Sequence, residues 1–472
     1  MFGSYASTCC LQVANALEGK VFTVGDAAYN ATETSYWSTQ EASLVPACVV
    51  LPQTSEDVAR FISVVSRISN CNFAIKSQGH APAAGMANVN GGVTVDLSWL
   101  NATIVSDDHS VASAGAGSAC LDVYRALDPY HKTVAGGRNG AVGVGGLTLG
   151  GGISYYSPQA GWSCDTVANF EVVLPSSEIV NANATSHPDL FRALKGGGNN
   201  FGVVTRMDFN TLDTVPVRGG HLFQSSDYIE RVLTAFAAIA SADNYDVHAS
   251  ITNSYVFNVT TGDWTVVSVP VYTLPDLDPP VYRDLFSIPN ITAESSAVIE
   301  NISTLAAEAA YPQRYEAFFT STYAASAPAL LAVFDAANQT LQTAPSPQDV
   351  NWSLTFEPLP TVLTQCGQGA NVLGVSSADG NAVILLVSVA CTEVDSSGFI
   401  HTTAPRLVRA MDEAADALGG LHRFRYLNYA NPSQDPIGSY GEENLEFLRN
   451  VSARYDPEGM FRRQVPGGFK LT

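Results

Sequence analysis

The sequence predicts an α+β protein of two domains, in which the second domain interrupts the first. The chain has 472 residues, which is too long for one ordinary hydrophobic core. Glycine separates short strands and helices over the first 210 residues, and its density falls between about residues 215 and 410. The pattern changes again after about residue 415. We therefore assign residues 1–214 and 415–472 to one domain and residues 215–414 to the other.

Local signals predict several elements of the first domain. Thr54 and Asp57 have the spacing of a capping box, and the apolar residues that follow recur at helical spacing. Alternation of apolar and polar residues over 92–97 predicts a half-buried strand. Ser186 is expected to cap a helix that has Pro188 just inside it and is ended by Gly196.

Further elements are expected in the middle and at the end of the chain. Residues 266–272 and 383–389 are typical of strands, and alanine-rich helices lie between them. Residues 423–429 predict another strand, and residues 442–455 predict a helix.

The charge of the chain argues against two classes of partner. Its formal net charge is −21, from 23 basic and 44 acidic residues. Such a surface repels phosphate backbones and anionic lipids, so we expect neither a nucleic acid nor a membrane as partner. No run approaches the 18 or so apolar residues that a membrane helix needs.

The cysteines and the glycosylation signals favour secretion. Cys9 and Cys10 are adjacent, and each is expected to pair with a more distant cysteine, Cys48 and Cys71 being the nearest. Cys120 and Cys164 are expected to be buried free thiols, and no cysteine spacing indicates zinc. The N-terminus has no leader features, so secretion requires a mature chain. The Asn-x-Ser/Thr signals start at Asn30, Asn101, Asn183, Asn258, Asn290, Asn301, Asn338, Asn351 and Asn450.

The first candidate site is a short loop that follows the apolar run at 73–75. Its sequence is Lys76-Ser77-Gln78-Gly79-His80. A loop that leaves a strand presents several backbone N–H groups together, which suits phosphate oxygens. Gly79 permits a backbone conformation or a close approach that a Cβ would prevent. An isolated histidine in such a loop is more often a hydrogen-bonded surface residue.

The second candidate site is a glycine-rich stretch at residues 136–152. Nine of its seventeen residues are glycine, so it presents a backbone surface and not a packed core of side chains. The pair Gly143 and Gly145 suggests a dinucleotide fingerprint, which requires a helix to follow. The run 150–152 would break that helix, so we reject a nicotinamide site. A P-loop is also rejected, because no Gly-Lys-Ser/Thr follows.

Taken together, these segments resemble the FAD-linked oxidases of the vanillyl-alcohol oxidase superfamily. Within it, the chain is similar to the berberine-bridge-enzyme-like branch and to its fungal oligosaccharide-oxidase-like members. The resemblance covers nearly the whole chain and rests on segments 76–80, 142–152, 195–205, 426–429 and 454–457. It implies a two-part FAD-binding domain of the PCMH type and an α/β substrate domain with an antiparallel sheet backed by helices.

The resemblance implies that His80 carries FAD through an 8α-histidyl bond. Many relatives add a cysteine three residues before the Val-Gly run, where this chain has Asn139, so we expect a single covalent link. Leu147 stands where many relatives have a histidine. The residues implied to contact FAD are Lys76, Ser77, Gln78, Gly79, His80, Ala81, Gly137, Asn139, Val142, Gly143, Gly146, Leu147, Gly150, Gly151, Gly202, Val204 and Asn428.

The resemblance also implies a tyrosine base. Tyr426 and Asn428 would lie on one face of the predicted strand 423–429, with Tyr426 as base and Asn428 beside the flavin ring. A phenol has an ordinary pKa near 10, so it needs a positive field to act as a base. Tyr429 is the competing assignment. Glu357, on a predicted strand at 352–357, is a second candidate, or equally a solvated carboxylate at a strand end.

The expected reaction is oxidation of a small alcohol or sugar by hydride transfer to flavin N5, with O2 reduced to hydrogen peroxide. A secondary-metabolite dehydrogenase or cyclase of the same family is the alternative. A non-catalytic flavin-binding protein is the rival from another class. We expect a monomer that acts on a small-molecule substrate, with no metal.

Overall fold

The computed structural model describes residues 4–291, 297–307, 313–344 and 346–471. Two hydrophobic cores organise them. One core joins residues between Cys9 and Val217 to the C-terminal residues from Phe424 onward. The other lies between Leu222 and Ala415. Several residues of the predicted middle domain, among them Ile302 and Leu373, pack into the first core. The proposed boundaries after residues 214 and 414 therefore stay predictions.

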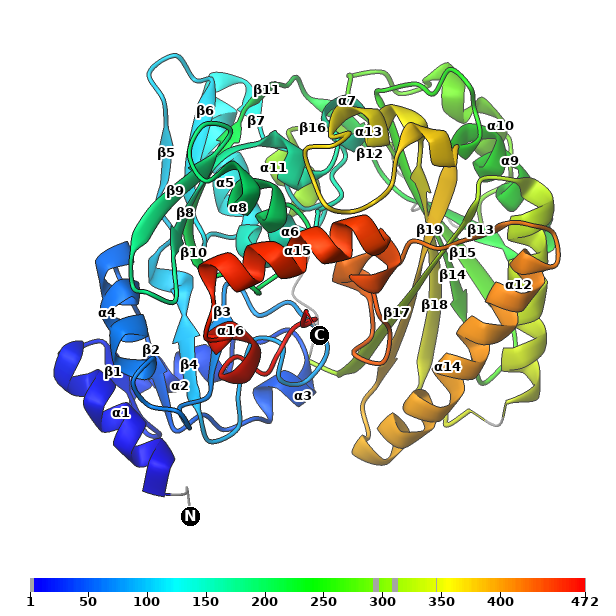
Figure 1. The fold of residues 1–472 in the computed structure, drawn as a ribbon. Helices are drawn as coiled ribbons and strands as arrows, with labels where there is room; N and C mark the ends of the chain where they lie inside the picture. Colours follow the sequence, from blue (N-terminus) through cyan, green and yellow to red (C-terminus); the bar gives the residue numbers. More distant parts are fainter. Residues whose placement is uncertain (1–3, 292–296, 308–312, 345, 472) are drawn as a thin grey trace.

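Two sheets form the first part of the molecule (Figure 1). The four-stranded sheet has the order β1-β2-β4-β3, with β2 parallel to β4 and β4 parallel to β3. Its strands are β1 (Val21–Phe22), β2 (Cys48–Val50), β3 (Phe73–Lys76) and β4 (Val93–Asp96). The five-stranded antiparallel sheet has the order β5-β6-β10-β8-β9. Its strands are β5 (Thr103–Val105), β6 (Val111–Gly115), β8 (Val167–Val173), β9 (Ile179–Asn183) and β10 (Val203–Asn210). A separate two-stranded pair joins β7 (Lys132–Thr133) to β11 (Leu212–Asp213).

The helices around these sheets are short. They are α1 (Ser4–Ala16), α2 (Ala27–Glu33), α3 (Thr39–Ala42), α4 (Ser55–Val65), α5 (Cys120–Leu127), α6 (Val144–Leu149), α7 (Ser157–Ala160) and α8 (Pro188–Leu194). The chain returns to them in α15 (Glu442–Tyr455) and α16 (Met460–Arg463), beside α8 and β3 (Figure 1).

A single nine-stranded antiparallel sheet dominates the middle of the chain. Its order is β16-β12-β15-β14-β18-β19-β17-β20, and β13 pairs with β15. The strands are β12 (Val217–Gly219), β13 (Leu222–Ser225), β14 (Ala249–Phe257), β15 (Trp264–Tyr272), β16 (Val298–Glu300), β17 (Tyr315–Ala324), β18 (Asn351–Leu359), β19 (Ala382–Cys391) and β20 (Leu421–His422).

Helices cover the outer face of this sheet (Figure 1). They are α9 (Ile229–Ala240), α12 (Ala327–Thr343) and α14 (Val394–Asp416), and shorter helices occur as α10 (Arg283–Phe286), α11 (Ile302–Ala306) and α13 (Thr361–Cys366). The second hydrophobic core combines most buried residues of this sheet with those of α9, α10, α12 and α14, whereas buried residues of α11 and α13 belong to the first core. The architecture confirms the expected α+β class.

Most local predictions are confirmed. Thr54 and Asp57 form the capping box of α4, and α15 has the predicted bounds. The strands expected at 266–272 and 383–389 lie within β15 and β19. The prediction for α8 was shifted by one residue. Its N-cap is His187 in a left-handed conformation, and Ser186 bonds instead to the His187 ring.

The strand predicted at 423–429 was wrong. Strand β20 ends at His422, and the predicted range holds only a 3-10 turn at Leu427–Tyr429. Arg425 explains why, because its guanidinium donates to the carbonyls of His422 and Phe424, while its own N–H donates to Ser439. Backbone groups that side chains satisfy in this way do not join a sheet.

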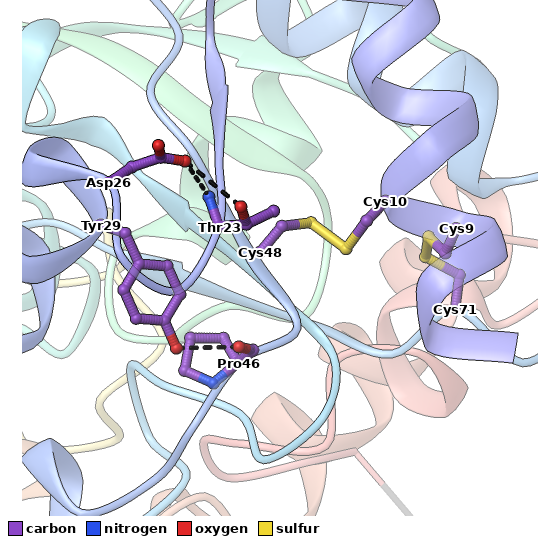
Figure 2. Close-up of a disulfide and its surroundings, with 8 residues drawn as sticks. All are labelled: Cys9, Cys10, Thr23, Asp26, Tyr29, Pro46, Cys48 and Cys71. Atoms are coloured by element: carbon purple, nitrogen blue, oxygen red, sulfur yellow. Dashed lines mark hydrogen bonds between the residues drawn. A yellow bond between two sulfur atoms is a disulfide. The ribbon is translucent and has the colours of Figure 1, made fainter. Parts of the chain in front are cut away.

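Two disulfides fasten α1 to the first sheet. Cys9 pairs with Cys71 and Cys10 with Cys48 (Figure 2). Cys48 begins β2, and Cys71 lies two residues before β3. Cys120 and Cys164 are buried free thiols, as predicted. Within the described residues, no helix is long and apolar enough to cross a bilayer.

Candidate active site

A cavity of ≈ 770 Å³ lies where the glycine-rich loops meet the nine-stranded sheet. One side is lined by the loop after β3, by α6 and by the chain around Gly202. The other side is lined by side chains of β14, β15, β18 and β19. The segment 426–430 lies between these two sides. A cavity of this size is in the range of small-molecule and cofactor sites.

The loop after β3 is held against the chain that follows β6. Ser77 Oγ donates to the carbonyl of Ala116 (2.6 Å), and Gln78 Nε2 donates to the carbonyl of Gly117 (2.5 Å). Gly79 has φ +66°, and a Cβ at this position would lie 2.8 Å from the Tyr36 ring. The turn therefore requires glycine for both its conformation and its space.

His80 lies in the wall of the cavity as an uncharged imidazole. Its ring stacks on Trp37, with 4.7 Å between ring centroids and 11° between planes. Burial lowers the pKa of His80 to about 4. The Nε2 atom is buried and has no hydrogen-bond partner among the described residues. The imidazole is therefore neutral at neutral pH, and the Trp37 ring lies against its face.

The glycines of residues 143–150 form a backbone surface, as the sequence predicted. A Cβ at Gly143 would lie 2.3 Å from Ser77 Oγ, and one at Gly150 would lie 2.0 Å from Asn428 Oδ1. Gly146 has nothing within 4 Å of a Cβ position and lines the cavity. Helix α6 begins after Gly143 and stops at Gly150, so no long dinucleotide-binding helix forms.

Most residues expected to contact FAD line this cavity. They are Ser77, Gln78, Gly79, His80, Ala81, Gly137, Asn139, Val142, Gly143, Gly146, Leu147, Gly150, Gly202, Val204 and Asn428. Two others are not brought to it. Lys76 is buried, and its Nζ pairs with Asp96 at 3.1 Å. A Cβ at Gly151 would face Leu373 and Trp162.

FAD fits this site on three observations. The wall is glycine backbone with free space at Gly146. A neutral histidine ring lies in the same wall. The cavity continues from His80 to Gly202 and Val204, which gives room for an elongated group. Asn139 Oδ1 accepts a hydrogen bond from the backbone N–H of Ala141 (2.8 Å), so this side chain shapes the loop.

Three side chains from distant segments form a polar group in the cavity wall. The Arg138 Nη2 atom lies 2.5 Å from Glu357 Oε1 and 2.7 Å from the Tyr429 hydroxyl oxygen. The Tyr429 hydroxyl also donates to Glu357 Oε1 (2.9 Å). Glu357 Oε2 is buried without a hydrogen-bond partner in the described structure. We call Arg138, Glu357 and Tyr429 the base cluster.

Burial and charge act in opposite directions in the base cluster. Burial alone would lower the pKa of Arg138, but the charge of Glu357 and the nearby Tyr429 raise it, so the guanidinium stays charged. Burial raises the pKa of Tyr429 well above its ordinary value, and Arg138 opposes that shift. Arg138 offsets only part of the effect of burial and of the Glu357 carboxylate, so the pKa of Tyr429 stays well above its ordinary value.

Tyr426 lies in a different environment. Burial raises its pKa, and its oxygen accepts hydrogen bonds from Asn428 Nδ2 (3.0 Å) and from the Gly152 backbone N–H (3.1 Å). Asn428 Nδ2 also donates to the carbonyl of Leu147 (2.9 Å). The two side chains meet through the 3-10 turn and not through strand alternation.

Sequence reasoning missed three residues of this site. Arg138 stands inside the glycine-rich stretch, where an arginine has no periodic or motif signal. Trp37 and Phe318 come from segments far from the loops, and their rings lie 5.4 Å apart between centroids. Each could be found only after folding, because no local pattern links it to His80 or Tyr429.

Comparison with known proteins agrees with this site. Residues 46–183 match the FAD binding domain family. An FAD-dependent monooxygenase from Cochliobolus heterostrophus is 36% identical over 453 residues, which cover 93% of this chain and 87% of that protein. A protein named an oligopeptidase from Diaporthe leptostromiformis is 36% identical over 466 residues, but the chain spans only 36% of its length.

Solved structures show the same fold at low identity. 6-Hydroxy-D-nicotine oxidase from Arthrobacter nicotinovorans has a TM-score of 0.78 at 20% identity, with 97% of this chain and 98% of that chain covered. Glucooligosaccharide oxidase from Acremonium strictum has a TM-score of 0.76 at 18% identity, with 99% of both chains covered. The chain therefore belongs to the family of FAD-dependent oxidoreductases that the Cochliobolus heterostrophus relative represents.

Proposed function

We propose that this enzyme carries FAD on His80 alone and oxidises a hydroxyl-bearing small molecule, with Tyr429 as the base. The base cluster is the observation that carries this proposal. It contains a phenol whose hydroxyl donates to a carboxylate and contacts a guanidinium, all in one wall of the cavity. Within the described residues, no carboxylate is hydrogen-bonded to Tyr426, whose oxygen accepts from an amide and a backbone N–H. We therefore prefer Tyr429 to Tyr426.

The single tether is supported by His80 and Asn139. His80 presents a neutral imidazole in the cavity wall, so it has a nitrogen lone pair to share. Asn139 also lines the cavity, and an amide cannot form a thioether. Glucooligosaccharide oxidase from Acremonium strictum, by contrast, is described with a 6-S-cysteinyl, 8α-N1-histidyl FAD.

Proton movement in the base cluster follows from its hydrogen bonds. When a substrate hydroxyl gives its proton to the Tyr429 oxygen, Tyr429 gives its own proton along the existing hydrogen bond to Glu357 Oε1, so the carboxylate is the final proton acceptor. Arg138 stabilises the negative charge that is then shared between the phenol oxygen and the carboxylate. Bound FAD supplies the two-electron acceptor, and O2 finally takes these electrons to give hydrogen peroxide.

The substrate side of the cavity favours an apolar alcohol or phenol over an oligosaccharide. The sheet presents the apolar side chains of Val269, Phe318 and Leu386 to the cavity, with Thr252 and Thr355 as its only uncharged polar side chains there in the described structure, and α11 adds Leu305. A sugar has many hydroxyls that would lose water against such a wall without replacement partners. Glu357 Oε2 is a buried acceptor that one substrate hydroxyl can satisfy. A secondary metabolite therefore fits better than a carbohydrate.

Replacing Tyr429 by Phe tests the proposed base. We expect the rate of flavin reduction by substrate to fall by about 10²–10⁴-fold, the range for a lost general base. Tyr426→Phe is the matched control and is expected to change this rate by less than about tenfold. Stopped-flow absorbance measures both after a panel of phenols, alcohols and oligosaccharides has been screened. An unchanged rate in Tyr429→Phe would remove this residue from the mechanism.

The same panel separates the competing reactions. Peroxide formed in proportion to substrate indicates an oxidase. Isotope from labelled O2 in the product indicates a monooxygenase, which is what the Cochliobolus heterostrophus relative is called. Turnover of oligosaccharides alone would contradict the proposed substrate class and leave the base assignment intact.

A further inference from the structure

Trp37 lies against the candidate tether from a part of the chain that no motif marks. It is in the connection between α2 and α3. Its indole is nearly parallel to the His80 imidazole, at 4.7 Å and 11°. A second aromatic ring, Phe318 on β17, lies 5.4 Å from the indole. The indole thus contacts both the tether and a residue of the substrate side of the cavity.

No hydrogen bond at Nε2 orients the His80 ring within the described structure. The ring has a hydrogen bond with the backbone of His80 itself. The stacked indole adds to that bond in restricting a χ2 torsion that is otherwise broad. The Trp37 backbone N–H donates to the carbonyl of Gly79 (3.1 Å), one residue before His80. The ring of Tyr36, the residue before Trp37, packs against Gly79. The loop and the indole are therefore fixed to each other.

Trp37 is itself held in place from the other side. The backbone N–H of Thr39 donates to the carbonyl of Arg314 (2.8 Å). The Gln40 side chain bonds to both backbone groups of Glu316, accepting from its N–H at 3.2 Å and donating to its carbonyl. Because the backbone on both sides of Trp37 is already fixed, the indole loses little further conformational entropy when it packs on the His80 ring.

We infer that Trp37 is a positioning residue that holds the His80 imidazole in the orientation required for its bond to the flavin. This inference rests on the proposed histidyl tether. Attachment breaks one N–H bond of neutral imidazole and one C–H bond of the flavin 8α-methyl group, and it forms one C–N bond. The two protons and two electrons released reduce O2 to hydrogen peroxide.

The inference is tested by separating bound flavin from attached flavin. Trp37→Ala, Trp37→Phe and the parent chain are purified as holoproteins, and total FAD per chain is measured by absorbance. The covalent fraction is then measured after acid precipitation and by fluorescence on a denaturing gel. Trp99→Ala is the matched control, because Trp99 is 41% exposed and packs on Phe22.

We expect Trp37→Ala to lower the covalent fraction at least tenfold while total bound FAD stays within about twofold. Trp37→Phe keeps a ring against His80 and should recover most of the attachment, and Trp99→Ala should match the parent. Full attachment in Trp37→Ala would overturn the inference. A parallel loss of total and attached FAD would also overturn it, because the residue would then be purely structural.

A separate outcome distinguishes failure of the tether itself. His80→Ala is expected to bind FAD without any covalent fraction. If the parent chain releases all its flavin on denaturation, the proposed tether is wrong, and the role of Trp37 falls with it.

Discussion

The two sides of the cavity are built in different ways. The cofactor wall, which we define as residues 77–81 and 143–150, is mostly backbone from two short segments. The base cluster is made of side chains that are 219 and 291 residues apart in the chain. The wall depends on atoms that are absent, because a Cβ at Gly143 or Gly150 would clash. The cluster depends on charges that must balance each other.

This difference predicts how each side fails when it is mutated. In the base cluster, removal of one partner leaves a buried charge without compensation. In the cofactor wall, an added side chain either blocks the cavity or pushes the loops apart. A change in the base cluster is expected to reduce the stability of the fold. A change in the cofactor wall can reduce cofactor binding while the stability of the flavin-free protein stays nearly the same.

The largest expected effect is that of Arg138→Met. Glu357 has a side chain only 3% exposed, and this change leaves its carboxylate without the guanidinium. We expect the free energy of unfolding to fall by about 3–5 kcal/mol, the range for breaking a buried pair. Urea unfolding measures it. The double variant Arg138→Met with Glu357→Leu should recover most of the loss, and a single variant as stable as the parent would show that the pair carries little energy.

An intermediate effect is expected from the wall. Gly146→Val adds a side chain where nothing lies within 4 Å, so it should fill cofactor space and lower bound FAD at least tenfold, with little change in the stability of the flavin-free protein. Gly143→Ala is the contrasting variant, because its Cβ would lie 2.3 Å from Ser77 Oγ. It should cost about 1–3 kcal/mol of stability. Equal FAD binding by Gly146→Val and the parent would contradict the assignment.

The smallest expected effect is the pH dependence that one buried carboxylate, Glu41, gives to the stability of the fold. Glu41 has no paired cation in the part of the chain that the structure describes, and its oxygens accept from the backbone N–H groups of Gly85 (2.9 Å) and Ala87 (2.6 Å). Burial outweighs these hydrogen bonds and raises its pKa from 4.5 to about 7. The folded protein therefore holds the proton more tightly than the unfolded chain does. Its contribution is full below pH 4.5 and is lost as the pH rises through about 7.

Glu41→Gln measures this contribution. We expect the variant to lose less stability than the parent between pH 5 and pH 8, when unfolding midpoints in urea are compared. Identical pH profiles for the two proteins would show that the carboxyl is not raised in the fold.

The cofactor wall and the base cluster also differ in how well the sequence predicted them. The capping box at Thr54 is decided by neighbours within a few residues, and the glycines at 79 and 143–150 indicate a backbone surface by composition alone. The atoms that crowd these glycines come from distant positions, namely Tyr36, Ser77 and Asn428. Such local rules led to confirmed predictions for α4, α15 and the glycine wall. The buried position of Lys76 was harder to predict from the sequence, because its ion-pair partner Asp96 lies on the neighbouring strand.

The remaining parts of the site could not be predicted because they depend on distant contacts. The strand expected at 423–429 failed when Arg425 and Ser439 satisfied its backbone. In the 3-10 turn that forms instead, the Tyr429 hydroxyl lies 2.9 Å from Glu357 Oε1. The role of Arg138 could not be predicted, because its partner Glu357 lies on β18, far away in the sequence.

The pairing of Cys9 with Cys71 and of Cys10 with Cys48 also decides how the protein answers to thiol reagents. Of eight cysteines, four are in disulfides, three are buried thiols, and Cys366 alone is an exposed thiol. Titration of the native protein should therefore count one thiol. Denaturation raises the count to four, and reduction raises it to eight. A single accessible sulfur is a ready attachment point for a spectroscopic label, placed on the α13 side of the molecule.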